Sequence, residues 1–321
     1  MSLYKKISPK IELITIKASG TASKLNWYNI VNAGKPEIDF LRKKFNFDFQ
    51  HLKASAAKSF SQRPMLMAET DYLFMILHFP NFLKNNIIAS EIEFFIGHDY
   101  IITIHNNNLP ALNDFFNLTK KDPELPFDHK LDSVAMLLSE ILDRLVQATY
   151  PILDHNSRSI DEVEDIIFRD EQKQAVSTIL ILRRNIINVR KIMQNHKEIL
   201  RKLKKLESAL VHKKRVAENY ARLVEHSKRI WDNLENQREM IEVLNNTNES
   251  LLNHKLNDIM KTLTIFSVIV IPLTLLAGVF GMNAKYMPFV DHVMGFWIII
   301  SLMAVCGLFM LLFFHKKKWL K

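Results

Sequence analysis

Two long apolar stretches lie at the end of the chain, and each is long enough to cross a membrane. From Thr262 to Phe280 there are nineteen residues without a charge, and a second uncharged run extends from Val293 to Phe314. A helix needs about 20 apolar residues to span the hydrocarbon core of a bilayer. Because only twelve residues separate the two runs, the pattern predicts an antiparallel pair of transmembrane helices.

The few polar residues of the first span follow one side of the predicted helix. Three of its four polar residues, Thr264, Ser267 and Thr274, are spaced for a single face, whereas Thr262 is not. Alternating steps of three and four residues keep to one face of a helix. They define a face that we call the stripe: Asn257, Met260, Thr264, Ser267, Ile271, Thr274, Gly278 and Gly281.

The stripe has two interpretations. Small and hydroxyl residues let membrane helices approach closely, and such contacts are the commoner use of a face like this. Alternatively, several copies of the chain turn the stripe inward, where it lines a water-filled pore. Taken by itself, the stripe favours a contact between helices.

Residues 1 to 130 have the mixed pattern of a cytoplasmic α/β domain. Alternating and aromatic-rich runs predict strands, and a proline or a capping asparagine marks the start of helices. The predicted elements are strands at 11–17 and 71–80, a hairpin at 90–105 with its turn at Gly97-His98-Asp99, and helices at 36–46 and 109–118.

Helical spacing continues almost without interruption from residue 131 into the membrane. No glycine occurs between Gly97 and Gly278, which favours long helices. We expect one helix from Leu131 to about Ile167 with a kink at Pro151, and another ending at Met193. The predicted domain order is the α/β domain (1–130), antiparallel cytoplasmic helices (131–210), a long stalk helix (211–280) ending in the first span (262–280), an external loop (281–292), a second span (293–314) and a basic tail (315–321).

Charge and cysteine content fix the expected topology and exclude several function classes. The net charge is +9, and lysines flank the cytoplasmic side of both spans, so the positive-inside rule places both termini in the cytoplasm. The single cysteine, Cys306, allows no intrachain disulfide and fits a reducing compartment. The sequence has no zinc-ligand spacing, nucleic-acid motif or nucleophile–base array, so we expect neither nucleic-acid binding nor enzyme activity.

A motif at the end of the first span, together with these features, points to a known protein family. Gly281-Met282-Asn283 closes the helix, with Pro272-Leu273-Thr274 before it and Met287-Pro288 after it. With the two spans, the lysine-rich tail and the α/β domain, these residues resemble the CorA family of magnesium transporters. The resemblance covers essentially the whole chain, including Arg63-Pro64 and the run at 71–80.

The resemblance implies a funnel-shaped homo-oligomer, of five copies, in the bacterial inner membrane. Its first span would line a pore for hydrated Mg²⁺, with Gly281, Met282 and Asn283 as the selectivity filter. Because Mg²⁺ holds its waters tightly, the neutral amide oxygen of Asn283 suits a hydrated ion. The resemblance places Asn257, Met260, Leu263 and Thr274 along the pore, the stripe adds Thr264, Ser267, Ile271 and Gly278, and a basic ring at the cytoplasmic end would contain Lys316, Lys317 and Lys318.

Three positions depart from the pattern of the family. Phe289 stands where relatives often carry an acid, and Lys285 offsets the charge of the loop. Phe280 replaces a tyrosine of many relatives. Arg222 lies where a regulatory acid is expected; an arginine cannot bind Mg²⁺, so nearby Glu225 is the candidate ligand instead.

We therefore predict a channel-like transporter of hydrated Mg²⁺, with Co²⁺ and Ni²⁺ as further ions, driven by the electrochemical gradient and gated by cytosolic Mg²⁺. The implied partners are other copies of the chain, the lipid bilayer and divalent cations, with no organic cofactor. Two alternatives remain at this point. One is a relative that selects Zn²⁺, and the other is a membrane-tethered coiled-coil scaffold in which the stripe is a dry seam.

Overall fold

The computed structural model describes residues 3–17, 24–56, 63–83, 86–121, 133–169, 171–210, 214–282, 293–317 and 319. These residues belong to two compact units, Met1–Asn245 and Asn246–Lys321. The boundary between the units falls inside one long helix. The domain boundaries expected from the sequence therefore stay a prediction.

A seven-stranded sheet forms the centre of the first unit. Its strands lie in the order β1-β2-β3-β7-β6-β5-β4, and all neighbours are antiparallel except β3 and β7. The strands are β1 (Leu3–Ser8), β2 (Ile11–Lys17), β3 (Lys24–Val31), β4 (Met65–Ala68), β5 (Leu73–Leu83), β6 (Asn86–Ile96) and β7 (Tyr100–His105).

The strands predicted at 11–17 and 71–80 and the hairpin at 90–105 are confirmed as β2, β5 and β6–β7. The sequence did not reveal β1, β3 and β4. β3 lies inside the sheet and is buried along most of its length, so it lacks the polar alternation that marks a half-exposed strand.

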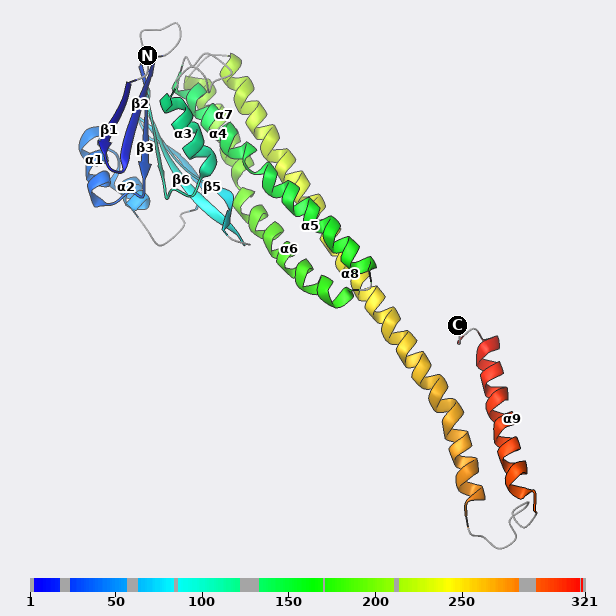
Figure 1. Cartoon of the computed structure of the whole chain (residues 1–321). Coiled ribbons are helices and arrows are strands. Elements are labelled where there is room, and N and C mark those ends of the chain that lie inside the picture. The colour runs from blue at the N-terminus through cyan, green and yellow to red at the C-terminus, as the bar shows by residue number, and fades with distance from the viewer. Residues whose placement is uncertain are drawn as a thin grey trace. The chain divides into compact units, whose positions relative to one another are not determined.

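Helices cover both faces of the sheet, as Figure 1 shows. On one face α1 (Lys35–Phe45) and α2 (Phe49–Ala56) bury a core that includes Tyr28, Leu41 and Leu52. The other face packs against α3 (Pro110–Lys121), α4 (Val134–Gln147), α6 (Gln172–Met193) and α7 (His196–Leu210). Trp27, fully buried, meets Phe116 of α3 edge to face with ring centroids 4.9 Å apart. Trp27 and Tyr28 are adjacent and therefore point to opposite faces.

Pro151 begins a helix rather than kinking one. α4 ends at Gln147 and α5 (Tyr150–Phe168) begins two residues after Ala148, with Pro151 in its first turn. The prediction of one kinked helix from Leu131 to Ile167 is wrong in this respect. A proline is tolerated in the first turn because the backbone N–H groups there have no partner within the helix.

α8 (Lys214–Phe280) is the longest helix of the described residues, with 67 residues. In the first unit its N-terminal part packs on α5 and α6. Gln237 Nε2 donates to the carbonyl of Leu153 at 2.8 Å and to Ser157 Oγ at 2.9 Å, and Arg190 pairs with Glu235 at 2.6 Å. These bonds attach α8 to the neighbouring helices.

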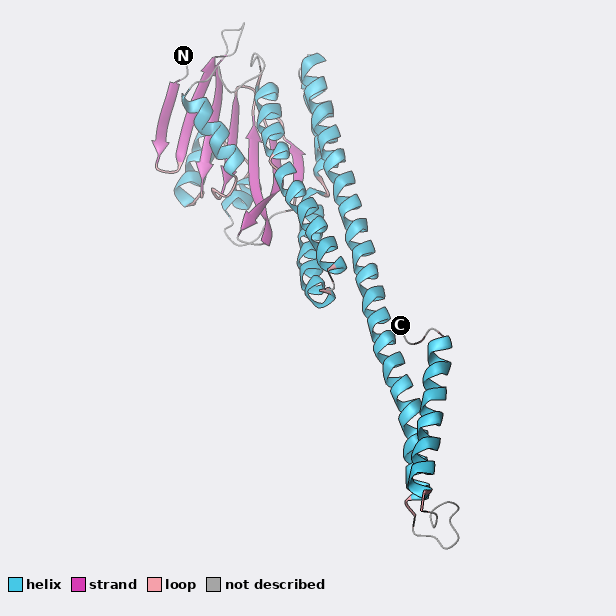
Figure 2. Cartoon of the chain, turned by 45° about the vertical axis from the view of Figure 1, so that its right-hand side comes forward, coloured by secondary structure: helices cyan, strands magenta, loops and turns pink. Residues whose placement is uncertain are grey.

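The second unit consists of the C-terminal part of α8 and α9 (Gly295–Lys316). Figure 2 shows the two helices side by side, and the chain reverses direction between them. Among the described residues, two helices are long and apolar enough to cross a membrane, and these are α8 and α9. The predicted pair of antiparallel, membrane-length helices is confirmed.

Candidate functional site

α9 covers one side of α8 within the second unit. A Cβ added at Gly307 of α9 would lie 3.7 Å from Leu273 Cδ1 of α8, which is van der Waals distance. Ile265 of α8 and Phe314 of α9 are both less than a tenth exposed. These contacts define the face of α8 that is turned to the second span.

The stripe lies on the opposite side of α8. With about 3.6 residues per turn, Ser267, Ile271 and Gly278 project roughly half a turn away from Leu273 and Ile265. The stripe is uncovered in a single chain: Met260 is 59% exposed and Ile271 is 65% exposed. A shallow hollow of about 420 Å³ follows the same side of the helix between Ile271 and Met282. The structure therefore leaves this face free for water or for other copies.

Leu263 is also uncovered, at 56% exposed, beside the row of hydroxyls. Asn257 and Met260 precede Leu263 by one to two turns of α8 and are exposed as well. All pore residues proposed from the sequence, from Asn257 to Gly278, thus share the half of α8 that α9 does not cover. Their role as a pore lining stays a prediction.

The hydroxyl groups of the stripe have a common orientation. Thr264 Oγ1 donates to the carbonyl of Met260 at 2.8 Å, Ser267 Oγ to Leu263 at 2.9 Å, and Thr274 Oγ1 to Val270 at 2.9 Å. Each hydroxyl proton is used within the helix, so only oxygen lone pairs remain for a partner outside it. A row of acceptors suits the water hydrogens around a cation.

Two glycines mark the C-terminal end of the stripe. A Cβ at Gly278 would meet nothing within 4 Å, whereas one at Gly281 would lie 3.0 Å from the carbonyl oxygen of Ala277. That carbonyl accepts the Gly281 N–H at 2.9 Å, and the close approach explains why a glycine ends the helix. Met282 is 62% exposed. Asn283 lies outside the described residues, so the complete filter stays a prediction.

The basic ring lies partly within the described chain. Lys316 is the last residue of α9 and Lys317 follows it as the C-cap, where positive charges favour the helix dipole. Lys318 lies outside the described residues. The arrangement of these lysines around a pore stays a prediction.

Glu225, the candidate regulatory ligand, forms an ion pair within its own helix. Arg229 Nε donates to Glu225 Oε1 at 3.3 Å, and both side chains are mostly exposed. Arg222, at the position that departs from the family, has its guanidinium 4.0 Å from the nearly buried Asp143 of α4. No group of three or more acidic, histidine or cysteine side chains in the described part of the chain is arranged to hold a metal. Glu225 as a regulatory ligand stays a prediction.

The sequence did not predict the contact between α8 and α9 that leaves the stripe uncovered. The alternating steps of three and four residues gave no signal for which side of α8 would meet α9. Leu273, inside the recognised Pro272-Leu273-Thr274 segment, carries that contact. Gly307 on α9 was its only available signal, because small residues allow membrane helices to pack closely.

An α/β domain and two helices of membrane length, of which the long helix α8 is one and α9 the other, define a membrane protein with a soluble N-terminal part. The model of the CorA-like Mg²⁺ transporter protein family matches residues 22–317. The chain belongs to this family.

Characterised relatives and solved structures agree with that membership. The chain is 25% identical over 299 residues to the cobalt/magnesium transport protein CorA of Thermotoga maritima, covering 92% of this chain and 83% of the relative. It is 24% identical over 315 residues to the protein of the same name from Methanocaldococcus jannaschii, covering 98% and 96%. The complete structure of the CorA magnesium transporter from Methanocaldococcus jannaschii shares its fold, with a TM-score of 0.83 at 23% identity over 100% of this chain and 99% of that one.

A more distant structure shares the fold of the soluble part. The cytoplasmic domain of ZntB from Vibrio parahaemolyticus aligns with a TM-score of 0.56 at 15% identity, over 79% of this chain and 98% of that one. At this identity the likeness concerns the fold alone.

Proposed function

We propose that this chain forms a homopentameric, channel-like transporter that carries hydrated Mg²⁺ into the cytoplasm. The observation that carries the proposal is the uncovered stripe of α8, whose hydroxyls present only acceptor oxygens. Mg²⁺ gives up its waters reluctantly, so a wall of neutral acceptors binds the ion through its hydration shell. Family membership supports divalent cations as the cargo.

The driving force requires no nucleotide hydrolysis. An inside-negative potential supplies about 2.3 kcal/mol per charge per 100 mV, hence about 4.6 kcal/mol for a divalent ion. The protein would lie in the bacterial inner membrane with both termini in the cytoplasm, as the distribution of lysines indicates. Asn283 would complete the filter at the outer mouth, and Met260 with Leu263 would form an apolar gate that closes by dewetting.

Flux into liposomes tests the proposal. Purified protein is reconstituted, and uptake of Mg²⁺, Co²⁺, Ni²⁺ and Zn²⁺ is measured with an imposed inside-negative potential. We expect Mg²⁺ uptake, with Co²⁺ and Ni²⁺ as further cargo, and its loss in Asn283→Ala. Absence of flux for every ion contradicts transport, and flux of Zn²⁺ alone contradicts the assignment to magnesium.

We further propose that cytosolic Mg²⁺ keeps the pore closed. The experiment compares conductance and protease sensitivity with and without Mg²⁺ on the cytoplasmic side. Removal of Mg²⁺ should raise both. If neither changes, regulation by Mg²⁺ is excluded while transport itself remains measurable.

A further inference from the structure

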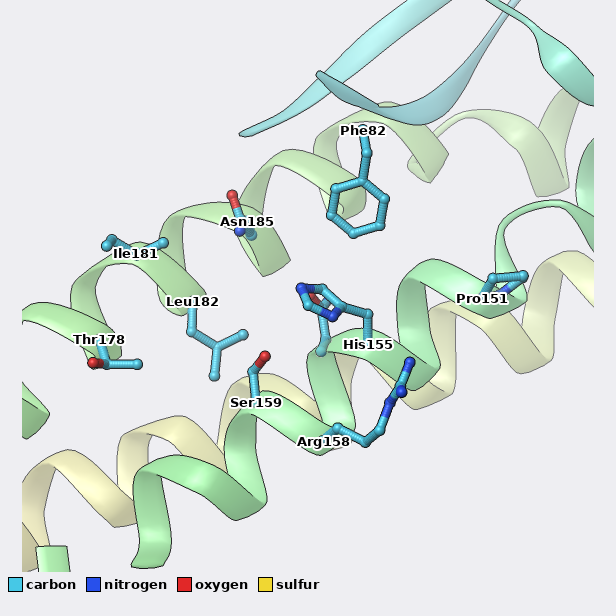
Figure 3. Close-up of a pocket in the computed structure, with 10 residues that line it drawn as sticks. Phe82, Pro151, His155, Arg158, Ser159, Thr178, Ile181, Leu182 and Asn185 are labelled. Atoms are coloured by element: carbon cyan, nitrogen blue, oxygen red, sulfur yellow. The ribbon is translucent and has the colours of Figure 1, made fainter. Parts of the chain in front are cut away.

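A cavity of about 590 Å³ lies between α5 and α6, and Figure 3 shows the side chains that line it. Two of these, Asn156 and Asn185, are buried amides whose Oδ1 atoms are closed off from solvent. Arg158, exposed on α5, is the only lysine or arginine among the described residues of the lining. The cavity therefore offers too few accessible polar groups to define a ligand. A cluster with a more specific geometry lies at the edge of the sheet.

Three different ligand atoms meet between α2 and the edge strand β4. His51 is on α2, Met67 is on β4, and Glu69 is the first residue beyond that strand. His51 Nε2 lies 3.3 Å from Met67 Sδ and 3.9 Å from Glu69 Oε1. An imidazole nitrogen, a thioether sulfur and a carboxylate oxygen thus converge, and each of these groups can bind a metal.

The imidazole ring of His51 is fixed by its neighbours. It is 7% exposed and stacks on Phe74, with ring centroids 4.3 Å apart and an interplanar angle of 17°. Its Nδ1 lies 2.9 Å from the hydroxyl oxygen of Tyr72, which also accepts the backbone N–H of Asp48 at 3.1 Å. When Nδ1 carries the ring proton, it donates to Tyr72, and the lone pair of Nε2 points at the sulfur. Histidines that bind metals are oriented in this way through their second ring nitrogen.

The spacing of nitrogen and sulfur leaves room for an ion that contacts both. With bonds of about 2.0 Å to nitrogen and about 2.3 Å to sulfur, as in zinc sites, the 3.3 Å separation gives an angle of about 100° at the metal. This angle is near the tetrahedral value. Met67 and the side chain of Glu69 are each 44% exposed, so an ion can enter from solvent.

The thioether determines which metal suits the cluster. Mg²⁺ takes oxygen ligands, whereas a thioether beside an imidazole favours the soft ion Cu(I). We propose that His51, Met67 and Glu69 bind copper(I), with the carboxylate of Glu69 as the third ligand. The site lies entirely within the first unit and shares no residue with the stripe. It can therefore be tested independently of transport.

Metal titration of the purified, untagged full-length protein tests the site. The parent protein is Cys306→Ser, because the thiol of the only cysteine would bind the same ions. Cu(I) is titrated without oxygen against a coloured Cu(I) chelator, and Ag(I), which is stable in air, is titrated by calorimetry. We expect one tight site per chain that excess Mg²⁺ does not displace, and X-ray absorption of the copper-loaded protein should show a sulfur neighbour. Absence of a tight site overturns the proposal, since the contact of Nε2 with sulfur would then be a hydrogen bond only.

Three substitutions localise the ion. His51→Gln and Met67→Leu should each weaken Cu(I) and Ag(I) at least about tenfold, and Met67→Leu should also remove the sulfur neighbour. Tyr72→Phe should weaken both ions about tenfold, because the orienting partner of the imidazole is lost. Met67→Leu keeps the volume of the side chain, so it tests the site even if His51→Gln fails to fold.

Matched controls use a methionine and a histidine outside the cluster. Met240 of α8 is 47% exposed, close to the exposure of Met67, and His254 of α8 is also exposed. Met240→Leu and His254→Gln should bind both ions within about twofold of the parent protein. If Met67→Leu binds them as tightly as Met240→Leu does, the ions bind elsewhere and the proposal is wrong.

Discussion

At the scale of single residues, the side of α8 on which a hydroxyl lies, and not its hydrogen bond, distinguishes the residues of the stripe from the other polar residues of the helix. Thr262 donates to the carbonyl of Asp258 at 2.9 Å, in the same way as Thr274 donates to Val270. The two threonines differ in which side of α8 they occupy. Thr262 shares the side of Leu273, which contacts α9, and Thr274 lies on the stripe.

This difference gives a matched pair of variants. Thr274→Val should lower Mg²⁺ flux about tenfold, because one acceptor is lost from every copy around the pore. Thr262→Val loses an equivalent intrahelical bond and should retain flux within about twofold of the unchanged protein. Liposome uptake measures both. Equal effects of the two variants would show that the hydroxyls act only within the helix.

Another residue-scale feature is a carboxyl buried between the sheet and α2. Glu93 of β6 is 6% exposed, and burial, followed by the nearby charge of Glu91, raises its pKa to about 8. A hydrogen bond from Ser55 works in the opposite direction. Glu91 in turn lies 2.8 Å from His78 on the neighbouring strand, directly opposite in register. Glu93 is therefore protonated at neutral pH in the folded protein.

Stability should consequently fall between pH 6.5 and 8. The unfolded chain releases the Glu93 proton near its ordinary pKa of 4.5, so in this window the native state binds one more proton than the unfolded state. The slope is at most about 1.4 kcal/mol per pH unit. Burial lowers the pKa of His105 and His196 to about 4. These histidines therefore lower stability only as the pH falls below 6.5, their ordinary pKa, where the unfolded chain binds the proton first.

Thermal unfolding of the purified protein checks this sign. The midpoint should decrease from pH 6.5 to 8, and Glu93→Gln should flatten the dependence because the amide cannot ionise. Glu69→Gln, at a residue whose side chain is 44% exposed, should keep the original dependence. A midpoint for Glu93→Gln that still decreases by the same amount would assign the effect to another group.

At the scale of elements, one buried amide that satisfies two acceptors helps to attach α8 to α5 in the first unit. Gln237 is 5% exposed and bonds Leu153 and Ser157 of α5. Gln237→Ala should destabilise the first unit by about 1–3 kcal/mol, because the carbonyl of Leu153 loses its donor in a buried setting. Denaturant unfolding monitored by tryptophan fluorescence measures the loss. Glu239→Ala, at an exposed position of the same helix, serves as the control and should change stability by less than about 0.5 kcal/mol.

Some helices and strands could be predicted from the sequence and others could not. β2 and the β6–β7 hairpin have the strand patterns that the sequence predicts, and α9 was predictable from its long uncharged run. β3 was not, because the helices on the two sides of the sheet bury both of its faces along most of its length. The break before α5 was placed at Pro151, although the chain turns at Ala148 and Thr149, because proline alone does not show whether it bends a helix or begins one.

At the scale of the whole molecule, the proposed assembly turns the stripe of every copy to a common axis. The chain offers a simple test, since Cys306 is its only cysteine. In a Cys306→Ser background, Thr274→Cys should react with a charged, water-soluble thiol reagent and lose about 90% of its Mg²⁺ flux. Phe266→Cys, exposed on α8 outside the stripe, should lose little because a reagent bound there would not enter the proposed pore.

Both variants are compared with the Cys306→Ser protein treated in the same way. Protection of Thr274→Cys by high Mg²⁺ would further support an ion path along the stripe. If only Phe266→Cys is blocked, the stripe is a packing seam and the scaffold interpretation is favoured.

The sequence by itself determined the class of protein. Two uncharged runs of membrane length, the lysines that flank them and Gly281-Met282-Asn283 identify the spans and the family, because the bilayer requires long apolar helices whatever the rest of the chain does. It also located the stripe, since helical spacing alone groups Thr264, Ser267 and Thr274.

Only the tertiary structure decided which side of α8 is free. The contact of Leu273 with Gly307 places α9 opposite the stripe, and the hydroxyl bonds turn the stripe into a row of acceptors. The cavity between α5 and α6 likewise arises from residues distant in sequence, Phe82 and Asn185 among them. Such features depend on which faces pack together, and packing between distant segments leaves no periodic signal in the chain.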